Sequence, residues 1–248
     1  MTQPLDLSQL VKESVAIIPV HNAHSYLAKT VAFLLTKYPK FPVILVDDFS
    51  DPQLTGFDPE DNEAYNIDVT VLRNERQQLF TRTVNKGIRY AKQKYDPNYY
   101  FIINSDCQFI DQPLEKLLET LQNPEIGLTG YEDSPQAKTE AYTLVDFPNF
   151  VTGHCLGIKK ELIETIGVLN ETEDGTSPCI FPELTQFKGL AHIGSDREYC
   201  YRALNAGYKI AYTNYPALNH KAGTSWGHNL SWLSSFDLQS LSAPSNTL

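Results

Sequence analysis

An aspartate at the end of an apolar run, Asp106, is the main candidate of this chain for binding a metal. Residues Tyr99–Ile103 are all aromatic or β-branched, which predicts a strand buried on both faces of a parallel sheet. The run ends at Asn104-Ser105-Asp106, and ligands of open α/β sheets bind beyond the carboxyl ends of the strands. A carboxylate there suits a hard divalent cation, which usually carries a phosphate group. We therefore expect Asp106 to hold a metal under a nucleotide diphosphate, although a turn or a helix cap also suits these residues.

Two further acidic positions could do chemistry. Asp47 and Asp48 follow the apolar run 41–46, so they could bind a metal or accept a hydrogen bond from a base or a ribose, as well as cap a loop. Asp196 follows Ser195 at the start of a predicted helix, where the helix dipole by itself favours an acid. The functional interpretation of Asp196 is a general base that points into a cleft. Two strands that end in acids at one edge of a sheet strengthen the prediction of a site.

A histidine near the end of the chain is a candidate second metal ligand. His220 lies in a polar segment before Gly223-Thr224-Ser225. A single histidine is more often structural, but next to Asp106 and a diphosphate its imidazole suits the same cation. Residues 221, 224 and 225 could then contact phosphate oxygens.

Alternating apolar patterns predict the elements that must position these residues. In the first half, strands are expected at 15–20, 41–46, 69–72 and 99–103, and helices at 26–35, 80–94 and 113–121. Strands that alternate with helices indicate parallel pairing with right-handed crossovers. We therefore predict an α/β fold with a doubly wound, mostly parallel sheet up to about residue 130. The chain has neither a Gly-x-Gly-x-x-Gly fingerprint nor a P-loop motif.

The second half has a different pattern, with fewer regular elements. Residues 132–149 are polar and are expected to be irregular, and 170–194 form a long stretch rich in proline and glycine. Between and after them we predict a strand at 150–158, helices at 160–166 and from 195 to Gly207, and a strand at 208–212. The Ser-rich end of the tail, beyond residue 236, is expected to be mobile.

Composition excludes several function classes. The chain has 248 residues, of which 42% are hydrophobic, and a net charge of −10, which argues against a general nucleic-acid binder and against docking on anionic lipid. The first 14 residues lack a signal-peptide apolar region, and no apolar run is long enough to span a membrane, so a cytoplasmic protein is expected. The four cysteines form no Cys-x-x-Cys pair, so we expect reduced thiols.

Taken in order, the motifs resemble those of the family 2 glycosyltransferases, which have the GT-A fold. The resemblance covers about residues 14–226, and the turn Asn104-Ser105-Asp106 is similar to the Asn-Pro-Asp of rhamnosyltransferase-like members. The matching segments are 15–22, 46–50, 85–88, 103–106, 195–208 and 220–225.

The resemblance implies a fold, an activity and partners. It implies one GT-A domain over 1–248, with a nucleotide-sugar-binding half at 14–130, an acceptor half at 131–226 and a tail at 227–248. Residues 132–150 and 170–194 become candidate lids. The implied activity is an inverting hexosyltransferase of polysaccharide biosynthesis that uses Mn²⁺ or Mg²⁺. Its donor is a nucleotide-diphosphate sugar and its acceptor is a carbohydrate or a lipid-linked glycan; a homodimer is left open.

The resemblance also implies roles for individual residues. Asp196 would be the catalytic base, and Asp106 with His220 would hold the metal. Acceptor contacts are expected from Gly153, His154 and Arg197, and nucleotide-sugar contacts, with Asp48 on the base, from Pro19, His21, Asn22, Asp48, Arg82, Asn85, Asn104, Ser105 and Asp106.

Several positions depart from the family pattern. The basic residue expected before Asn85 is Val84, so Arg82 would have to replace it. The first acid of the metal motif is Asn104, and the acids that flank the base are replaced by Ser195 and Glu198. A non-catalytic member that only binds a sugar or a nucleotide is therefore the alternative function.

Overall fold

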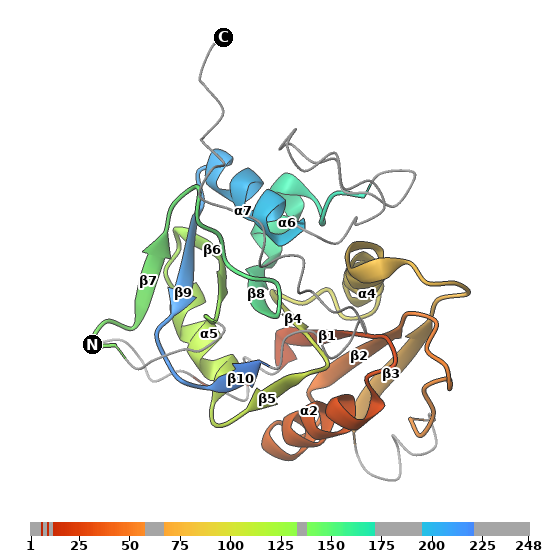
Figure 1. Ribbon diagram of the computed structural model, residues 1–248. Helices are drawn as coiled ribbons and strands as arrows, with labels where there is room; N and C mark the ends of the chain where they lie inside the picture. The colour runs from red at the N-terminus through yellow and green to blue at the C-terminus, as the bar shows by residue number, and fades with distance from the viewer. Residues whose placement is uncertain are drawn as a thin grey trace, which may run out of the picture.

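A mixed eight-stranded sheet forms the centre of the protein (Figure 1). The computed structural model describes residues 6, 9, 12–57, 67–132, 138–171 and 195–220, and all structural statements below concern these residues. In spatial order the strands are β3 (Asp68–Arg73), β2 (Pro42–Asp47), β1 (Ser14–Val20), β4 (Tyr99–Ile103), β8 (Cys155–Lys159), β6 (Ile126–Gly130), β9 (Lys209–Thr213) and β7 (Tyr142–Val145). A separate antiparallel pair is formed by β5 (Cys107–Phe109) and β10 (Leu218–His220).

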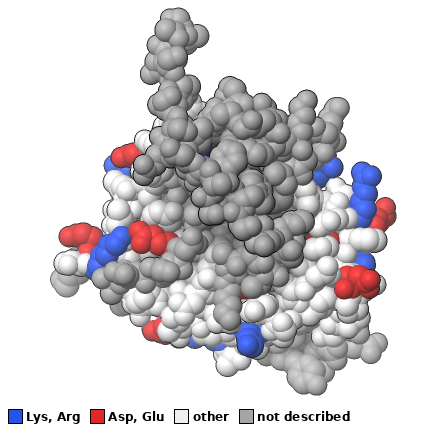
Figure 2. Space-filling model, in the orientation of Figure 1, with Lys and Arg blue, Asp and Glu red and all other residues white. Residues whose placement is uncertain are grey.

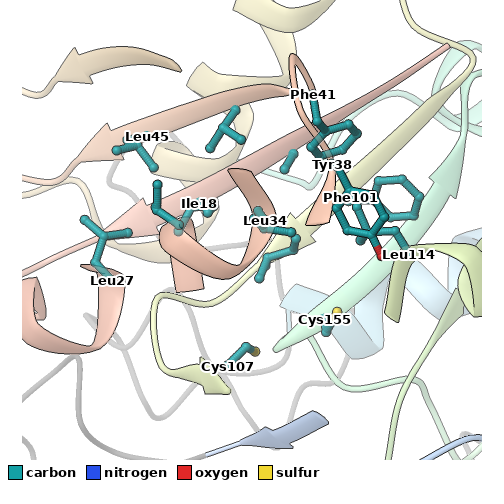
Figure 3. Close-up of a cluster of buried hydrophobic side chains, with 14 of the residues drawn as sticks. Ile18, Leu27, Leu34, Tyr38, Phe41, Leu45, Phe101, Cys107, Leu114 and Cys155 are labelled. Carbon is teal, nitrogen blue, oxygen red and sulfur yellow. The ribbon is translucent and has the colours of Figure 1, made fainter. Parts of the chain in front are cut away.

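Helices cover both faces of the sheet, so the fold has three layers. They are α2 (His24–Lys37), α4 (Leu79–Lys94), α5 (Pro113–Leu121), α6 (Lys160–Ile166) and α7 (Ser195–Asn205). Buried side chains of α2 and α5 form one core with the sheet, part of which Figure 3 shows, and those of α4, α6 and α7 form a second core on the opposite face.

The alternation of side chains along the central strands supplies both cores. In β1, Ala16 and Ile18 point into the α2 layer, and Val15 and Ile17 point into the α4 layer. A strand with helices on both sides is apolar at every position, which is why the central strands read as continuous apolar runs. All of these side chains are fully buried.

One antiparallel strand interrupts the parallel sheet at its centre. β1, β2, β3 and β4 pair in parallel, as the sequence predicts, and β6 pairs in parallel with β9. β8 lies antiparallel between β4 and β6, with Ile103 opposite Cys155. Because β4 ends where β8 begins, the residues that follow β4 lie beside those that precede β8.

The sequence predicted most elements of the first half and fewer of the second. The bounds of β4, α5 and α6 are those expected. The strand predicted at 150–158 begins only at Cys155, since the partner strand β4 ends at Ile103 opposite it. The prediction that 132–149 is irregular was wrong for β7, an edge strand whose exposed Leu144 obscures the pattern. Strands β5, β6 and β10 were not predicted, and most of 170–194 and the tail lie outside the described residues.

The described surface carries charges of both signs. On the face drawn in Figure 2, acidic and basic side chains lie interspersed around the margin of the described part. Within the described ranges, no helix has the length and apolar character to cross a membrane.

Helix α4 approaches β1 very closely at Gly87. A Cβ atom added there would lie 2.4 Å from Cγ2 of Ile17 and 3.2 Å from Cγ2 of Val46, both buried side chains of the sheet. Contacts under 3.0 Å require a shift of the neighbours, so only glycine allows this helix to approach so closely. This approach places the start of α4 at the carboxyl end of β2, where the candidate site lies.

We expect Gly87→Ala to lower the free energy of unfolding by about 1–3 kcal/mol, because overpacking outweighs the gain in helix propensity of about 1 kcal/mol. Urea unfolding measures the change. Lys92→Ala, on the exposed side of the same helix, is the control and should stay within about 0.5 kcal/mol of the parent. A Gly87→Ala protein as stable as the parent would show that the packing is looser than described.

Candidate active site

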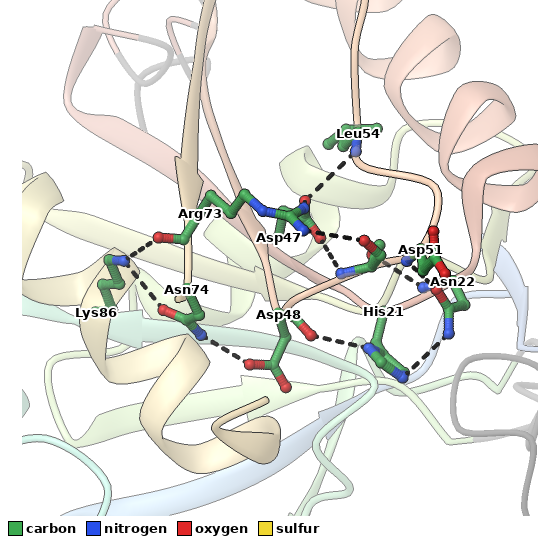
Figure 4. A network of polar contacts seen from close by, with 10 residues as sticks. His21, Asn22, Asp47, Asp48, Asp51, Leu54, Arg73, Asn74 and Lys86 are labelled. Carbon is green, nitrogen blue, oxygen red and sulfur yellow. Dashed lines mark hydrogen bonds and ion pairs between the residues drawn. The ribbon is translucent and has the colours of Figure 1, made fainter. Parts of the chain in front are cut away.

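The two acids at the end of β2 point to opposite sides of the sheet edge (Figure 4). Asp47 accepts hydrogen bonds from the N–H groups of Ser50, at 2.9 Å, and Leu54, at 3.4 Å, and forms an ion pair with Arg73. Burial by itself raises the pKa of Asp47, but the donors of Ser50 and Leu54 and the charge of Arg73 outweigh it and lower the pKa overall. Asp47 is therefore an ionised structural residue that holds the loop after β2.

Asp48 points toward the start of α4 and is 1% exposed. Its carboxylate accepts from the N–H groups of Gln78, at 2.7 Å, and Leu79, at 2.9 Å, and from Nδ2 of Asn74, at 2.8 Å. It thus caps α4, whose N-cap residue Gln78 makes no side-chain cap of its own. A carboxylate offers about four acceptor sites, so three are already used by the protein. The base-reading role of Asp48 stays a prediction.

The residues after β1 fasten this strand to the loop that follows β2. Nδ1 of His21 donates to the carbonyl oxygen of Asp48 at 2.8 Å. Asn22 has a left-handed φ of 55°, donates its N–H to Oγ of Ser50 at 3.0 Å and accepts from the N–H of Asp51 at 2.8 Å. These contacts give the carboxyl ends of two parallel strands one rigid edge (Figure 4). The nucleotide contacts assigned to His21 and Asn22 stay predictions.

Three other residues predicted to bind the donor lie at this edge or near it. The side-chain amide of the buried Asn85 makes two hydrogen bonds with the backbone of Leu169. Nδ2 of Asn85 donates to the carbonyl oxygen of Leu169 at 2.7 Å, and Oδ1 of Asn85 accepts from the N–H of Leu169 at 3.1 Å. Asn85 therefore ties α4 to the segment after α6. Nη1 of Arg82 lies 3.3 Å from Oε1 of Gln78, at the start of α4, and Pro19 is buried in β1.

The turn after β4 is held from two sides. The carbonyl oxygen of His154 accepts from the N–H of Asn104 at 2.8 Å and from Sγ of Cys107 at 3.1 Å. Oγ1 of Thr30, on α2, hydrogen-bonds with the carbonyl oxygens of Ser105 and Cys107 at 3.0 and 2.9 Å. The sequence did not single out Thr30, which reads there as one more residue on the buried face of a helix. The backbone that carries Asp106 is thus rigidly positioned.

Asp106 and His220 lie side by side, as the sequence predicts for two ligands of one ion. The pairing of β10 with β5 sets His220 opposite Cys107, and Nε2 of His220 is 3.4 Å from Oδ1 of Asp106. Two neighbouring ligands, each about 2.1 Å from a small divalent cation, lie about 3 Å apart, so the pair fits such an ion. Among the described residues no group of three or more His, Cys, Asp or Glu side chains could hold a metal. Asp106 and His220 are therefore the two described residues that could hold a cation here.

The imidazole of His220 stacks on a second histidine, His154. The ring centroids are 4.5 Å apart and the ring planes differ by 11°. His154 is 3% exposed, and its Nδ1 lies 2.8 Å from Oγ1 of Thr152. These contacts place His154 in the cluster around Asp106. Its predicted contact with the acceptor stays untested.

Asp196 reaches the same region from the start of α7. Its Oδ2 accepts from the N–H of Gly153 at 2.9 Å, and its Oδ1 accepts from the N–H of Arg197 at 2.8 Å. Burial raises the pKa of Asp196 above its ordinary value of 3.8, although the N–H groups of Arg197 and Gly153 oppose the shift. The Arg197 guanidinium lies over the rings of Phe147 and Phe150, at 5.8 and 6.0 Å.

The second acid of α7 is engaged elsewhere. Glu198 is buried and pairs with Arg202 at 2.6 Å, one helical turn away, and accepts from Asn170 at 2.6 Å. Arg202 also donates to the carbonyl oxygen of Val168 at 2.9 Å. Glu198 and Arg202 therefore anchor α7 to the segment after α6, and Asp196 is the acid of this turn that binds the backbone of Gly153.

The structure thus separates the predicted site residues into two groups. Asp106, His220, His154, Gly153 and Asp196 lie on or beside one short segment, residues 153–154, and the first two of them form the candidate metal pair. The donor-binding candidates form a second group around the ends of β1 and β2 and the start of α4. Residues 221, 224 and 225 lie outside the described residues.

Comparisons with known proteins bear on the family and the fold of this chain. The family model "Glycosyl transferase family 2" matches residues 15–150. An uncharacterized glycosyltransferase from Haemophilus influenzae is 29% identical over 141 residues, which cover 56% of this chain and 42% of that protein. The chain therefore spans less than half the length of this curated relative.

Solved structures with a similar fold include two kinds of glycosyltransferase. S. aureus TarS has a TM-score of 0.58 at 14% identity, over 84% of this chain and 36% of its own. Residues 1–349 of TarS in complex with UDP-GlcNAc have a TM-score of 0.55 at 14% identity, and the match covers 83% of this chain and 57% of that one. GalNAc-T7 with UDP, GalNAc and Mn²⁺ has a TM-score of 0.57 at 16% identity, over 84% and 43%. At these identities the likeness shows the fold.

We expect Asp48→Asn to lower the free energy of unfolding by about 1–3 kcal/mol, because an amide group cannot accept from three donors at once. Thermal and urea unfolding of the protein without nucleotide measure this, with the exposed Asp51→Asn as the control. If Asp48→Asn unfolds like the parent but binds UDP more weakly, the carboxylate serves the nucleotide and does not cap the helix.

Proposed function

Because this chain belongs to glycosyltransferase family 2 and has the GT-A fold, we propose that it transfers a sugar from a nucleotide-diphosphate sugar to an acceptor hydroxyl. One observation carries the proposal: the segment 153–154 connects Asp196, an acid with a raised pKa, to the pair of Asp106 and His220. A carboxylate that could act as a base and a pair that could hold a cation are thus both in contact with residues 153–154. This supports a reaction that uses a base together with a cation.

The donor side of the reaction is assigned to the ends of β1, β2 and β4. TarS was crystallised in complex with UDP and with UDP-GlcNAc, and GalNAc-T7 with UDP, GalNAc and Mn²⁺. A UDP-sugar with Mn²⁺ or Mg²⁺ is therefore the first donor to test. Asp106 and His220 would hold the cation, which when bound neutralises negative charge on the departing diphosphate. The chain itself contributes a rigid turn, fastened by Thr30 and the carbonyl of His154, that keeps the Asp106 carboxylate in place.

Asp196 is assigned as the base that activates the acceptor. It would take the proton of the acceptor hydroxyl while the oxygen bonds to the anomeric carbon and the bond from that carbon to the diphosphate breaks. A raised pKa makes a carboxylate a better base near neutral pH. A single displacement inverts the anomeric centre, whereas retention by double displacement needs a second, nucleophilic carboxylate close by. Glu198, the neighbouring acid, is ion-paired with Arg202, which supports inversion.

The acceptor is proposed to be a carbohydrate or a lipid-linked glycan that lies against the start of α7. Gly153 presents its backbone next to Asp196, and an added Cβ there would lie in contact with Cβ and Oδ2 of Asp196, both at 3.4 Å. Arg197, stacked against Phe147 and Phe150, forms an aromatic and cationic surface of the kind that binds sugar rings.

We expect Asp196→Asn to lower kcat by about 10²–10⁴-fold without weakening UDP-sugar binding, because the amide cannot take a proton. Release of UDP with an acceptor panel and calorimetry with UDP measure the two effects. Asp146→Asn, an exposed acid in the same half of the chain, is the control. Near-normal kcat in Asp196→Asn would reassign the base.

The same substitution should not destabilise the protein. The pKa of Asp196 is raised on folding, so the folded state holds this proton more strongly, and stability falls as pH rises from 3.8 through the raised pKa. At pH 7 the Asn variant should therefore unfold at the same temperature as the parent or higher. In the parent, kcat should fall as the pH drops through the raised pKa, and this acid limb should vanish in Asp196→Asn. A lower melting temperature at pH 7 would indicate a structural role.

Metal dependence is tested separately on Asp106. We expect UDP to bind the parent more tightly with Mn²⁺ or Mg²⁺ than in chelator, and Asp106→Ala to reduce the affinity for Mn²⁺ by at least about 10-fold. Calorimetry measures both, and Asp111→Asn, an acid outside the cluster, is the control. Equal UDP affinity in chelator and in Mn²⁺ would contradict the metal assignment.

A further inference from the structure

His154 is anchored at both its backbone and its side chain. Its carbonyl oxygen accepts from the N–H of Asn104 and from Sγ of Cys107, and its Nδ1 is hydrogen-bonded with Oγ1 of Thr152 at 2.8 Å. The residue is 3% exposed. The ring therefore has a fixed orientation that is set by its own segment.

His220, in contrast, lies on a short strand. β10 has three residues and pairs only with β5, and both form a small sheet separate from the central one. Backbone pairing fixes the position of the His220 Cα atom but leaves the two side-chain torsions of the imidazole open. The stack on His154, with centroids 4.5 Å apart and planes 11° from parallel, is a contact that constrains the plane of its ring.

We propose that His154 is a positioning residue, whose buried ring orients the imidazole of His220 so that Nε2 faces Oδ1 of Asp106. The 3.4 Å separation between these two atoms is the geometry that would receive a divalent cation. The inference rests on the proposed metal dependence and adds a residue outside the pair that sets it up. Groups that orient metal-binding histidines usually do so through hydrogen bonds, whereas here a flat ring face does so.

A matched pair of variants separates orientation by the ring from simple filling of space. Leucine and phenylalanine both fill an apolar site and both lose the hydrogen bond to Thr152, but only phenylalanine keeps a flat ring. We expect His154→Leu to weaken Mn²⁺ binding in the presence of UDP by about 10-fold, and His154→Phe to stay within about threefold of the parent. Calorimetry with Mn²⁺ measures this, and His24→Leu on α2 is the control.

A second readout needs no metal. The ring of His154 shifts the NMR signals of the His220 ring protons, so these signals should move in His154→Leu and remain shifted in His154→Phe. Thr152→Val keeps both rings but removes the hydrogen bond that holds the ring of His154. It should therefore broaden the His220 signals. It should also weaken Mn²⁺ binding, but less than His154→Leu does.

The outcomes distinguish this inference from the proposed function. If His154→Leu binds Mn²⁺ as well as the parent does, and its His220 signals stay at the positions they have in the parent, this inference is overturned and the metal site stands. If His154→Leu and His154→Phe are equally impaired, His154 is a structural residue and the inference again fails. If the parent binds no Mn²⁺ in the presence of UDP, the proposed metal role and this inference fall together.

Discussion

The antiparallel pairing of β4 with β8 is the constraint on which the site depends. With Ile103 opposite Cys155, the residues that leave β4 and those that enter β8 must lie side by side. The backbone before β8 then holds the Asp106 turn with one carbonyl group, on His154, and the Asp196 carboxylate with one N–H group, on Gly153. A parallel strand at this place would put its amino end at the opposite edge of the sheet, and residues 153–154 could not hold the turn after β4.

Three buried or half-buried acids, Asp47, Asp48 and Asp196, are stabilised in different ways. Asp47 and Asp48 use most of their acceptor capacity on donors of the protein itself, which fixes the loops after β2 and the start of α4. Asp196 accepts from two N–H groups, but burial still raises its pKa. The folded protein therefore disfavours the ionised form of this carboxyl group, as is common at functional sites. The carboxylates that hold the loops are thus different from the one whose pKa is raised.

Helix α4, like residues 153–154, connects the first half of the chain with the second. Its start is capped by Asp48, its middle approaches β1 through Gly87, and its Asn85 holds the backbone of Leu169. The segment after α6 is also bound by Arg202 of α7. Elements of the first and the second half of the chain are therefore linked through buried hydrogen bonds.

Local sequence patterns were sufficient for the elements that bury a whole face or both faces. Residues 99–103, 113–121 and 160–166 have the predicted bounds, because apolar spacing along the chain records which faces are covered. The edge strand β7 escaped prediction because half of its side chains face water, and the short pair β5 and β10 escaped because each has only three residues. Strand order and direction are not encoded by such spacing, so the antiparallel β8 could not be foreseen.

The sequence by itself determined which acids follow strands β2 and β4, Asp48 and Asp106, and which acid begins helix α7, Asp196, in an order that identified the family. Only the tertiary structure decided what each group contacts. The cap of Asp48 on α4, the bond of Asn85 to Leu169 and the stack of His154 on His220 all join segments far apart in the chain. The physical reason is that a hydrogen bond or a ring contact depends on the approach of two backbones within a few ångströms. That approach is set by strand pairing and helix packing, which no local pattern specifies.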